Sequence, residues 1–383
     1  MSLFSVVVLG GYGLFGSRIA RRLARERDWR VVIAGRDGAA AAALCDEIRC
    51  DDATAATLVP LACDLQSPEF RDVLRHANAD LVINTCGPFQ GQDYSVARAA
   101  LDANAHYVDL ADARAYVAAF GALDDEARGR GRLAVAGAST VPGLSSAVVD
   151  RFLREFATLD AIDIGISPGN RTPRGLATVA AILGYIGKPI PWREHGKRRD
   201  VAGWQSLRRN RYPAPVGARW LAACDVPDLD LFPQRYPALR SLRFRAGLEL
   251  AYLHFGLWLV SWLVRAGLVH ALERHARAMK SISERFARSG SDAGAMHVEM
   301  SGVDRDGRPL GIRWRLVAEA GDGPEIPATA AVLLARQLAA GAITARGAMA
   351  CAGLFTLEEF LATLAGYAIT TSVERFQPRN RAA

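Results

Sequence analysis

The chain has 383 residues, half of them hydrophobic, with 47 Lys and Arg against 40 Asp and Glu, a net charge of +7. This composition excludes a disordered chain, and the length exceeds what one hydrophobic core usually supports, so we expect two domains. The basic balance suits anionic ligands. Because no nucleic-acid-binding motif accompanies it, we expect no nucleic-acid partner. The cysteines form no C-x-x-C pair and no cluster with histidine, so we expect no metal site.

The amino-terminal segment carries the strongest motif. An apolar run from Val6 to Leu9 predicts a strand that leads through Gly11-x-Gly13-x-x-Gly16 into an amphipathic helix. This order is typical of dinucleotide-binding sites. The first glycine permits a sharp turn, the second lets backbone approach a pyrophosphate, and the third lets helix and strand pack closely. The helix N-terminus then offers free N–H groups to the anion.

The second predicted strand, which begins at Trp29, bears on the choice of cofactor. An NAD-binding domain usually places Asp or Glu at the tip of this strand, where it accepts a hydrogen bond from the ribose 2′-hydroxyl. Here the tip is Ala34-Gly35, followed by Arg36, whose guanidinium can donate two hydrogen bonds to a 2′-phosphate. We therefore expect NADP(H) to be favoured over NAD(H), unless Asp37 and not Arg36 faces the ribose.

Strands and helices continue to alternate up to residue 136. Wholly apolar strands between helices predict a Rossmann-type α/β fold, a doubly wound parallel sheet covered on both faces, with its ligand beyond the carboxyl ends of the strands. The further predicted strands are 57–63, 81–85, 106–110 and 133–136, and the predicted helices are 39–48, 68–76, 94–103 and 116–129. The candidate cofactor-binding residues are Gly11, Gly13, Leu14, Phe15, Gly16, Arg36, Asp64, Leu65, Thr85, Cys86, Gly87 and Pro88.

The remainder of the chain mixes strands and helices. Residues 161–167 predict a strand, and residues 296–303 and 311–318 predict a hairpin because Asp304–Arg308 between them contains Asp-Gly. Helices are expected at 328–340 and 357–364. The basic stretch Arg193–Arg211 is interpreted as a solvated loop.

One apolar segment does not fit a simple soluble domain. Residues 250–264 carry no Asp, Glu, Lys or Arg, but the run is too short to span a bilayer. His254, Ser261 and Arg265 would form a narrow polar stripe on an otherwise apolar helix. Such a helix is usually buried in a domain core or a dimer interface. The alternative is peripheral membrane contact through residues 246–288, whose later part is basic.

Four motifs of the first domain together resemble the saccharopine dehydrogenase-like oxidoreductase family: Gly10–Gly16, Asn84–Gln90, Tyr107–Asp112 and Gly137–Leu144. Residues 165–170, 214–219, 225–228 and 347–360 also resemble members of that family, so the resemblance covers most of the chain. It implies an NADP-binding Rossmann domain over residues 1–143 and a second, α+β domain with a mixed sheet over residues 144–325, for substrate binding and dimerisation. It also implies C-terminal helices over residues 326–383 that return to the first domain, and a homodimer.

The resemblance also implies the chemistry, which is hydride transfer between NADPH and an imine carbon. Tyr107 and Asp109 are the candidates for proton handling, with Asp112 as the substitute. Alternatively, Asp109 only caps the loop that follows it. Cys86 is interpreted as part of the wall of the nicotinamide site and not as a nucleophile.

Arginine is the natural partner of a substrate carboxylate, and Arg114, Arg171 and Arg174 lie closest in sequence to strand ends. The alternative is that they are ordinary surface arginines. Two functions remain open. The first is an NADP-dependent oxidoreductase that acts on an imine, carbonyl or activated double bond of a small-molecule substrate. The second is a non-catalytic nucleotide-binding protein that docks on a membrane or a protein partner. The chain begins without a signal-peptide pattern, so we expect a cytoplasmic protein.

Overall fold

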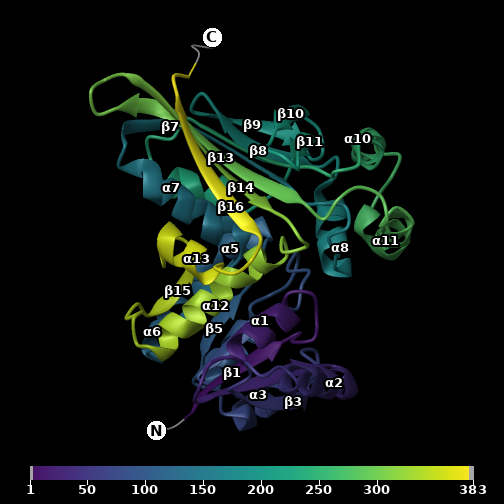
Figure 1. Ribbon diagram of the computed structural model, residues 1–383, viewed down its shortest axis with the longest axis vertical. Coiled ribbons are helices and arrows are strands. Elements are labelled where there is room, and N and C mark those ends of the chain that lie inside the picture. Colours follow the sequence, from purple (N-terminus) through teal and green to yellow (C-terminus); the bar gives the residue numbers. More distant parts are fainter. Residues whose placement is uncertain (1–2, 379–383) are drawn as a thin grey trace. The chain divides into compact units, whose positions relative to one another are not determined.

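A computed structural model describes residues 3–378, and the chain divides into two compact units (Figure 1). The first unit contains the residues up to 143 together with residues 324–363. The second contains residues 144–323 and the chain from residue 364 onward. A π-type turn at Thr140–Leu144 leads from the first unit into the second.

The first unit is built on a parallel sheet of seven strands in the order β15-β6-β5-β4-β1-β2-β3. The chain reverses its direction of progress across the sheet between β1 and β4, which is the switch point where Rossmann-type folds bind dinucleotides. The predicted doubly wound parallel sheet is confirmed. Its strands are β1 (Phe4–Leu9), β2 (Trp29–Gly35), β3 (Thr57–Ala62), β4 (Leu81–Asn84), β5 (His106–Asp109), β6 (Leu133–Ala136) and β15 (Gly347–Ala350).

Helices flank this sheet (Figure 1). The expected single helix over residues 116–129 is wrong, because the segment forms two short helices and an intervening 3-10 turn. Gly121 is a poor helix former, and acidic residues at positions 124–126 favour the start of a new helix. The helices of the first unit are α1 (Gly16–Leu23), α2 (Gly38–Arg49), α3 (Phe70–Ala77), α4 (Ser95–Asp102), α5 (Arg114–Ala118), η1 (Phe120–Leu123), α6 (Asp124–Gly129), α12 (Glu325–Ala339) and α13 (Leu357–Thr363).

A buried arginine joins α1 to the C-terminal helices of the same unit. Arg22 is only 6% exposed, and its guanidinium donates to the Thr329 hydroxyl at 2.9 Å and to the Thr363 carbonyl at 2.8 Å. Because a buried charge is tolerated only when its donors are satisfied, these contacts couple the position of α1 to α12 and α13.

The second unit contains a mixed sheet of nine strands, in which β7 pairs in parallel with β12 and antiparallel with β13. The predicted hairpin is present, with β13 and β14 in register from Gly294–Ala318 to Val303–Pro309. The strands are β7 (Phe156–Ser167), β8 (Pro189–Glu194), β9 (Lys197–Ala202), β10 (Arg208–Arg211), β11 (Ala218–Ala223), β12 (Ser241–Ala246), β13 (Gly294–Asp304), β14 (Pro309–Ala318) and β16 (Ile369–Phe376). The helices are α7 (Ser145–Leu153), α8 (Leu176–Tyr185), α9 (Asp228–Arg235), α10 (Ala251–Arg265), η3 (Leu272–His275) and α11 (Ala276–Glu284).

Two expectations about this unit are wrong. The basic stretch 193–211 is not a solvated loop, because it contains the end of β8, all of β9 and β10. Its charged side chains line exposed edge strands, where Lys and Arg discourage pairing with other chains. Residues 364–378 also form no helix, because β16 pairs antiparallel with β14 and so extends the second sheet. The Ile-Thr-Thr-Ser-Val run of β16 is rich in the β-branched residues that favour strands.

The apolar segment 250–264 forms α10, but its polar stripe faces inward. His254 and Ser261 are fully buried, whereas Leu259 and Trp262 are 58% and 44% exposed. Leu257, Trp258 and Val264 pack against the apolar core of this unit, so the expected burial in the domain core holds for one side of the helix and is wrong for the side of Leu259 and Trp262. Burial of that side in a dimer interface stays a prediction. No helix among residues 3–378 is long and apolar enough to cross a membrane.

Candidate cofactor site and active site

The glycine loop between β1 and α1 is packed so tightly that side chains are excluded at specific positions. A Cβ at Gly16 would lie 2.2 Å from the Gly10 carbonyl oxygen, and one at Gly11 would lie 2.8 Å from the Val8 carbonyl oxygen. Gly10 itself has φ +71°, a conformation that favours glycine. The Gly13 N–H closes the turn by donating to the Gly10 carbonyl at 2.8 Å. The loop therefore holds β1 and α1 closer than side-chain-bearing residues would allow.

The N-terminus of α1 is suited to an anion. The helix has no acidic residue in its first turn, and no side chain caps its N-terminus at Phe15. The Ser17 N–H already donates to the Gly13 carbonyl at 3.0 Å, and the helix dipole places partial positive charge at this end of α1. Leu14 and Phe15 immediately precede the helix and are half-buried. This end of α1 can therefore hold a pyrophosphate.

The tip of β2 separates the roles of Arg36 and Asp37. Asp37 begins α2 as its N-cap, and its carboxylate accepts the Ala40 N–H at 3.0 Å. Its own N–H donates to the Tyr12 hydroxyl at 2.9 Å, and the Tyr12 ring lies where a Cβ on Gly35 would be. Arg36 is exposed. The acidic residue is thus engaged in capping a helix, while the guanidinium lies at the surface. Tyr12 was not predicted from the sequence, because nothing in the motif marks the position after Gly11 as a packing residue.

The two candidates beyond β3 differ in exposure. Asp64 is exposed, and its carboxylate accepts the Gln66 N–H at 3.0 Å. Leu65 is half-buried. The exposed carboxylate and the half-buried apolar side chain both follow the carboxyl end of β3, on the same edge of the sheet as the tip of β2.

The loop after β4 joins the glycine loop through Thr85. The Thr85 hydroxyl donates to the Leu9 carbonyl at 2.8 Å, and a Cβ at Gly10 would lie 2.7 Å from that hydroxyl oxygen and 2.9 Å from the Cys86 sulfur. Asn84 accepts the Cys86 N–H at 3.0 Å. The next peptide bond, Gly87–Pro88, is cis. The structure therefore brings Thr85 and Cys86 against the first glycines, as expected from the neighbouring positions of β1 and β4.

Cys86 lacks the properties of a nucleophile. Burial raises the pKa of its thiol to about 12, so the protonated form dominates at neutral pH. A reactive cysteine needs a lowered pKa, because the thiolate is the attacking species. The geometry is consistent with its interpretation as part of the wall of the site.

Tyr107 and Asp109 are both fully buried at the end of β5. Asp109 accepts the N–H groups of Ala111 at 3.0 Å and Gly137 at 2.8 Å, and burial raises its pKa to about 6. The Tyr107 hydroxyl accepts a hydrogen bond from the Asn84 amide at 3.1 Å. These contacts tie together the loops that follow β4, β5 and β6. Asn84 was missed from the sequence because it ends an otherwise apolar strand.

Asp112 differs from the other two proton-handling candidates because it is half-buried. Its carboxylate accepts the Gln90 side-chain amide at 3.3 Å, and burial raises its pKa. Gln90 belongs to the loop after β4 and Asp112 to the loop after β5. The loops after β4 and β5 therefore share one half-buried carboxylate.

The three candidate arginines do not belong to one unit. Arg114 is the half-buried first residue of α5 in the first unit. Arg171 and Arg174 follow β7 in the second unit, where Arg171 is exposed and Arg174 donates to the Asn170 side chain at 3.3 Å. Asn170 is itself 3% exposed, and its backbone N–H donates to the Glu249 carboxylate at 2.6 Å. The motif at residues 165–170 thus has a clear structural role in the second unit.

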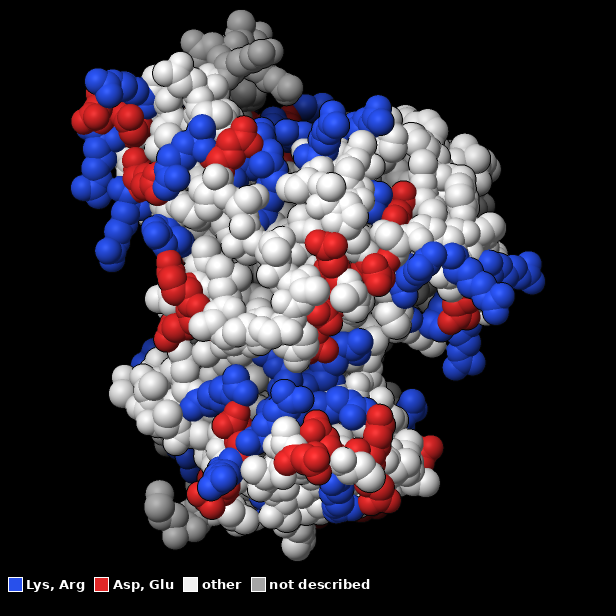
Figure 2. Space-filling view, in the orientation of Figure 1, with Lys and Arg blue, Asp and Glu red and all other residues white. Residues whose placement is uncertain are grey.

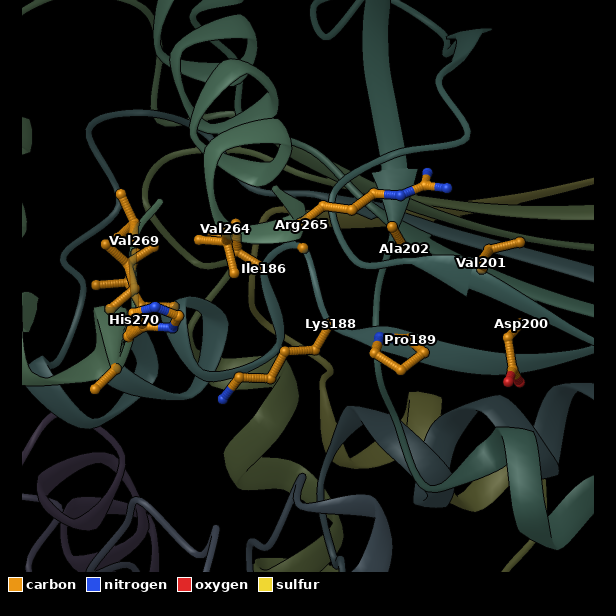
Figure 3. A pocket seen from close by; sticks show the side chains of 14 residues that line it. Ile186, Lys188, Pro189, Asp200, Val201, Ala202, Val264, Arg265, Val269 and His270 are labelled. Carbon is orange, nitrogen blue, oxygen red and sulfur yellow. The ribbon is translucent and has the colours of Figure 1, made fainter. Parts of the chain in front are cut away.

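A pocket of about 550 Å³ in the second unit lies between the start of β8 and the C-terminal end of α10. Its polar lining residues are Lys188, Asp200, Arg265 and His270. Figure 3 shows the Arg265 side chain directed away from Lys188. It also shows Asp200 and His270 at opposite ends of the pocket. Within the described part of the chain, no group of three or more His, Cys, Asp or Glu residues could hold a metal ion. The side chains of this pocket do not converge on one point as catalytic groups do.

Comparison with known proteins identifies residues 6–135 of the first unit. Residues 6–135 match the family model described as the saccharopine dehydrogenase NADP binding domain. A search of curated proteins found no match. Residues 6–135 are therefore an NADP-binding Rossmann domain of the saccharopine dehydrogenase type, which confirms the expected cofactor and the resemblance of this domain.

Solved structures resemble the chain only distantly. The structure of amine dehydrogenase from Mycobacterium smegmatis is 10% identical, with a TM-score of 0.48, and the match covers 92% of this chain and 95% of that one. A bulky-bulky ketone specific alcohol dehydrogenase from Comamonas testosteroni is 18% identical, with a TM-score of 0.24, over 28% of this chain and 56% of that one. L-sorbose reductase from Gluconobacter frateurii, complexed with NADPH and L-sorbose, is 16% identical, with a TM-score of 0.24, over 28% and 52%. The chain thus spans about half the length of these last two structures.

Proposed function

We propose that the protein is an NADP-dependent oxidoreductase that transfers hydride between NADP(H) and an imine, carbonyl or activated double bond of a small molecule. The observation that carries this proposal is the arrangement at the cofactor edge of the first sheet. The glycine loop and the N-terminus of α1 suit a pyrophosphate, and Arg36 lies exposed beside them while Asp37 caps α2. When bound, the nicotinamide supplies or accepts the hydride.

In this proposal Asp112 handles the proton. A general acid or base must lie within hydrogen-bond reach of the reacting atoms, and of the three candidates Asp112 is half-buried whereas Tyr107 and Asp109 are fully buried. Its pKa is raised by burial, which moves a carboxyl group toward the range in which it can donate as well as accept a proton at neutral pH. Asp109 and Tyr107 act as positioning residues that fix the loops after β4, β5 and β6.

For a substrate that carries a carboxylate, the same proposal assigns that group to an arginine. Arg114 is the candidate in the first unit because it follows the loop of Asp112 by two positions. Arg171 and Arg174 are the candidates from the second unit. Arg174 donates to the Asn170 side chain at 3.3 Å and Arg171 to the Arg288 carbonyl at 3.5 Å, and a guanidinium has five N–H donors in all.

Calorimetric titration of the full chain with NADPH and NADH, for wild type and for Arg36→Ala, tests the proposal. We expect wild type to prefer NADPH by at least about tenfold, or about 1.4 kcal/mol, and the variant to lose this preference. Arg27→Ala is the matched control: Arg27 is also exposed, but it precedes β2 and so lies at the opposite end of that strand.

The outcomes separate the parts of the proposal. Equal affinity of wild type for the two nucleotides would remove the role given to Arg36. Absence of binding to both would refute the proposed function itself. If Arg27→Ala removed the preference as well, the effect would come from total charge and not from contact with a 2′-phosphate.

A further inference from the structure

Helix α10 of the second unit presents an apolar face to solvent. Tyr252, Leu259 and Leu263, spaced as i, i+7 and i+11, are 53%, 58% and 38% exposed, and Trp262 beside them is 44% exposed. Leu268, just after the helix, is 73% exposed. These spacings place the side chains on one side of the helix. An uncharged exposed surface of this kind marks an interaction site.

The orientation of α10 is fixed by polar contacts on its inner side. The Gln205 amide donates to the Ser261 hydroxyl at 3.3 Å, and the Trp204 indole N–H donates to the His254 carbonyl at 3.0 Å. Arg265 donates to the Gln205 side-chain oxygen at 3.1 Å. Turning the apolar residues inward would break these buried contacts, so the exposed face is a property of the fold.

Basic residues adjoin this face. Residues 266–288 contain five basic side chains and two acidic ones: Arg274, Arg277, Lys280, Arg285 and Arg288 against Glu273 and Glu284. Both acidic residues pair with lysines, Glu273 with Lys188 and Glu284 with Lys280. Figure 2 shows Lys and Arg gathered over α11, beside an uncharged area over α10. We call the exposed apolar residues of α10, Leu268 and these basic residues the α10–α11 face.

A groove of about 260 Å³ opens within this face, between α8, α10 and α11. Its walls are apolar except for Arg174 and Ser283. Two of its lining residues, Tyr252 and Ile282, are also 53% and 46% exposed at the surface. The apolar character of the face therefore continues below the surface, where hydrocarbon could enter.

We propose that the α10–α11 face docks on the surface of an anionic lipid bilayer. An amphipathic helix of this composition lies in the plane of the interface, with aromatic and aliphatic side chains among the lipid headgroups and basic side chains on anionic lipids. At fifteen residues α10 is too short to span the bilayer. A two-fold interface between copies is less suited to the face, because it would bring the same basic patch against itself. This inference does not depend on the proposed enzymatic function.

Co-sedimentation of the full chain with vesicles tests the docking surface. We expect binding to phosphatidylcholine vesicles that contain about one third phosphatidylglycerol, weaker binding at high salt, and little binding to phosphatidylcholine alone. The double variant Leu259→Gln, Trp262→Gln should bind at least about tenfold more weakly. Val373→Gln is the control, because Val373 is similarly exposed, at 43%, but lies on β16.

A second pair of variants tests the charge. Arg277→Gln with Arg285→Gln should weaken vesicle binding, by about fivefold for each charge removed. Arg198→Gln with Arg308→Gln removes the same charge from exposed positions outside the face and should leave binding unchanged. All four substitutions are at exposed positions, so melting temperatures should stay near that of wild type.

Other outcomes would overturn the proposal. Absence of binding to anionic vesicles, or binding that the Leu259 and Trp262 substitutions leave intact, would show that this face does not dock on bilayers. Sedimentation velocity distinguishes the main competitor. If wild type is a dimer that Leu259→Gln, Trp262→Gln dissociates, the face is an interface between copies of the chain and the membrane proposal is wrong.

Discussion

The glycine loop offers a contrast between two substitutions of the same kind. Gly13 and Gly16 both lack the positive φ that would exclude alanine, so only space decides their tolerance. A Cβ at Gly16 would lie 2.2 Å from the Gly10 carbonyl oxygen, whereas one at Gly13 would lie 3.0 Å from the same atom. Cβ atoms essentially never approach closer than 3.0 Å, so Gly16→Ala must move α1 from the loop by about 0.8 Å.

The magnitude follows from what holds α1. Its displacement is opposed by the buried contacts of Arg22 with α12 and α13. Overpacking of this kind costs about 2–3 kcal/mol, which corresponds to a fall of about 5–10 °C in the melting temperature of a unit of this size. Gly13→Ala needs only a small adjustment and restricts the unfolded chain, so its melting temperature should stay within about 2 °C of wild type.

Binding should respond differently from stability. A methyl group at Gly13 occupies the space through which backbone approaches the pyrophosphate, so Gly13→Ala should lose at least about tenfold in NADPH affinity while remaining as stable as wild type. Gly16→Ala should lose both stability and affinity. Thermal unfolding by circular dichroism and calorimetric titration with NADPH measure the two quantities. Wild-type affinity in Gly13→Ala, or an unchanged melting temperature in Gly16→Ala, would refute the reasoning.

Two further predictions concern carboxyl groups. Asp112→Asn should lower kcat by about 100-fold or more, measured as NADPH oxidation with any substrate that the wild type turns over. NADPH affinity should stay unchanged. Unchanged turnover would exclude Asp112 as the proton-handling group. Asp228 on α9 is fully buried beside the Ser145 hydroxyl that donates to it, and burial raises its pKa to about 7. Because the folded state holds this proton more tightly, the free energy of unfolding should fall by about 4 kcal/mol as pH rises from about 4 to about 7 through this group alone. Asp228→Asn should remove that part of the pH dependence and be more stable than wild type at pH of about 8; equal pH profiles of the free energy of unfolding would contradict the assignment.

Much of the first unit follows from its sequence for a local reason. Each apolar strand is followed by a helix, and parallel strands bury both faces, so the pattern of β1 to β6 leaves few alternatives. The glycine spacing likewise reflects a local requirement, since the contacts that exclude a Cβ at Gly11 and Gly16 include atoms of the same strand–turn–helix segment. The Asp-Gly turn between β13 and β14 is another feature that a few neighbouring residues specify.

The tertiary structure decided what depends on distant partners. Residues 347–350 become the edge strand β15 only because β6 offers an unpaired edge, and residues 369–376 join the second sheet because β14 does. Whether Arg36 or Asp37 is engaged at the tip of β2 depends on Tyr12 and on the start of α2, which the motif does not reveal.

Helix α10 shows the limit most directly. Its sequence determines that one face is apolar and that a narrow stripe is polar, but not which of them faces the protein. Residues about fifty positions earlier in the chain hold the inner side of α10: the Trp204 indole N–H donates to the His254 backbone carbonyl, and the Gln205 amide donates to the Ser261 hydroxyl. The periodicity of a helix sequence shows which residues share a face of the helix. Whether that face is buried depends on the chemistry of the surface that it meets, and only the folded chain brings that surface into place.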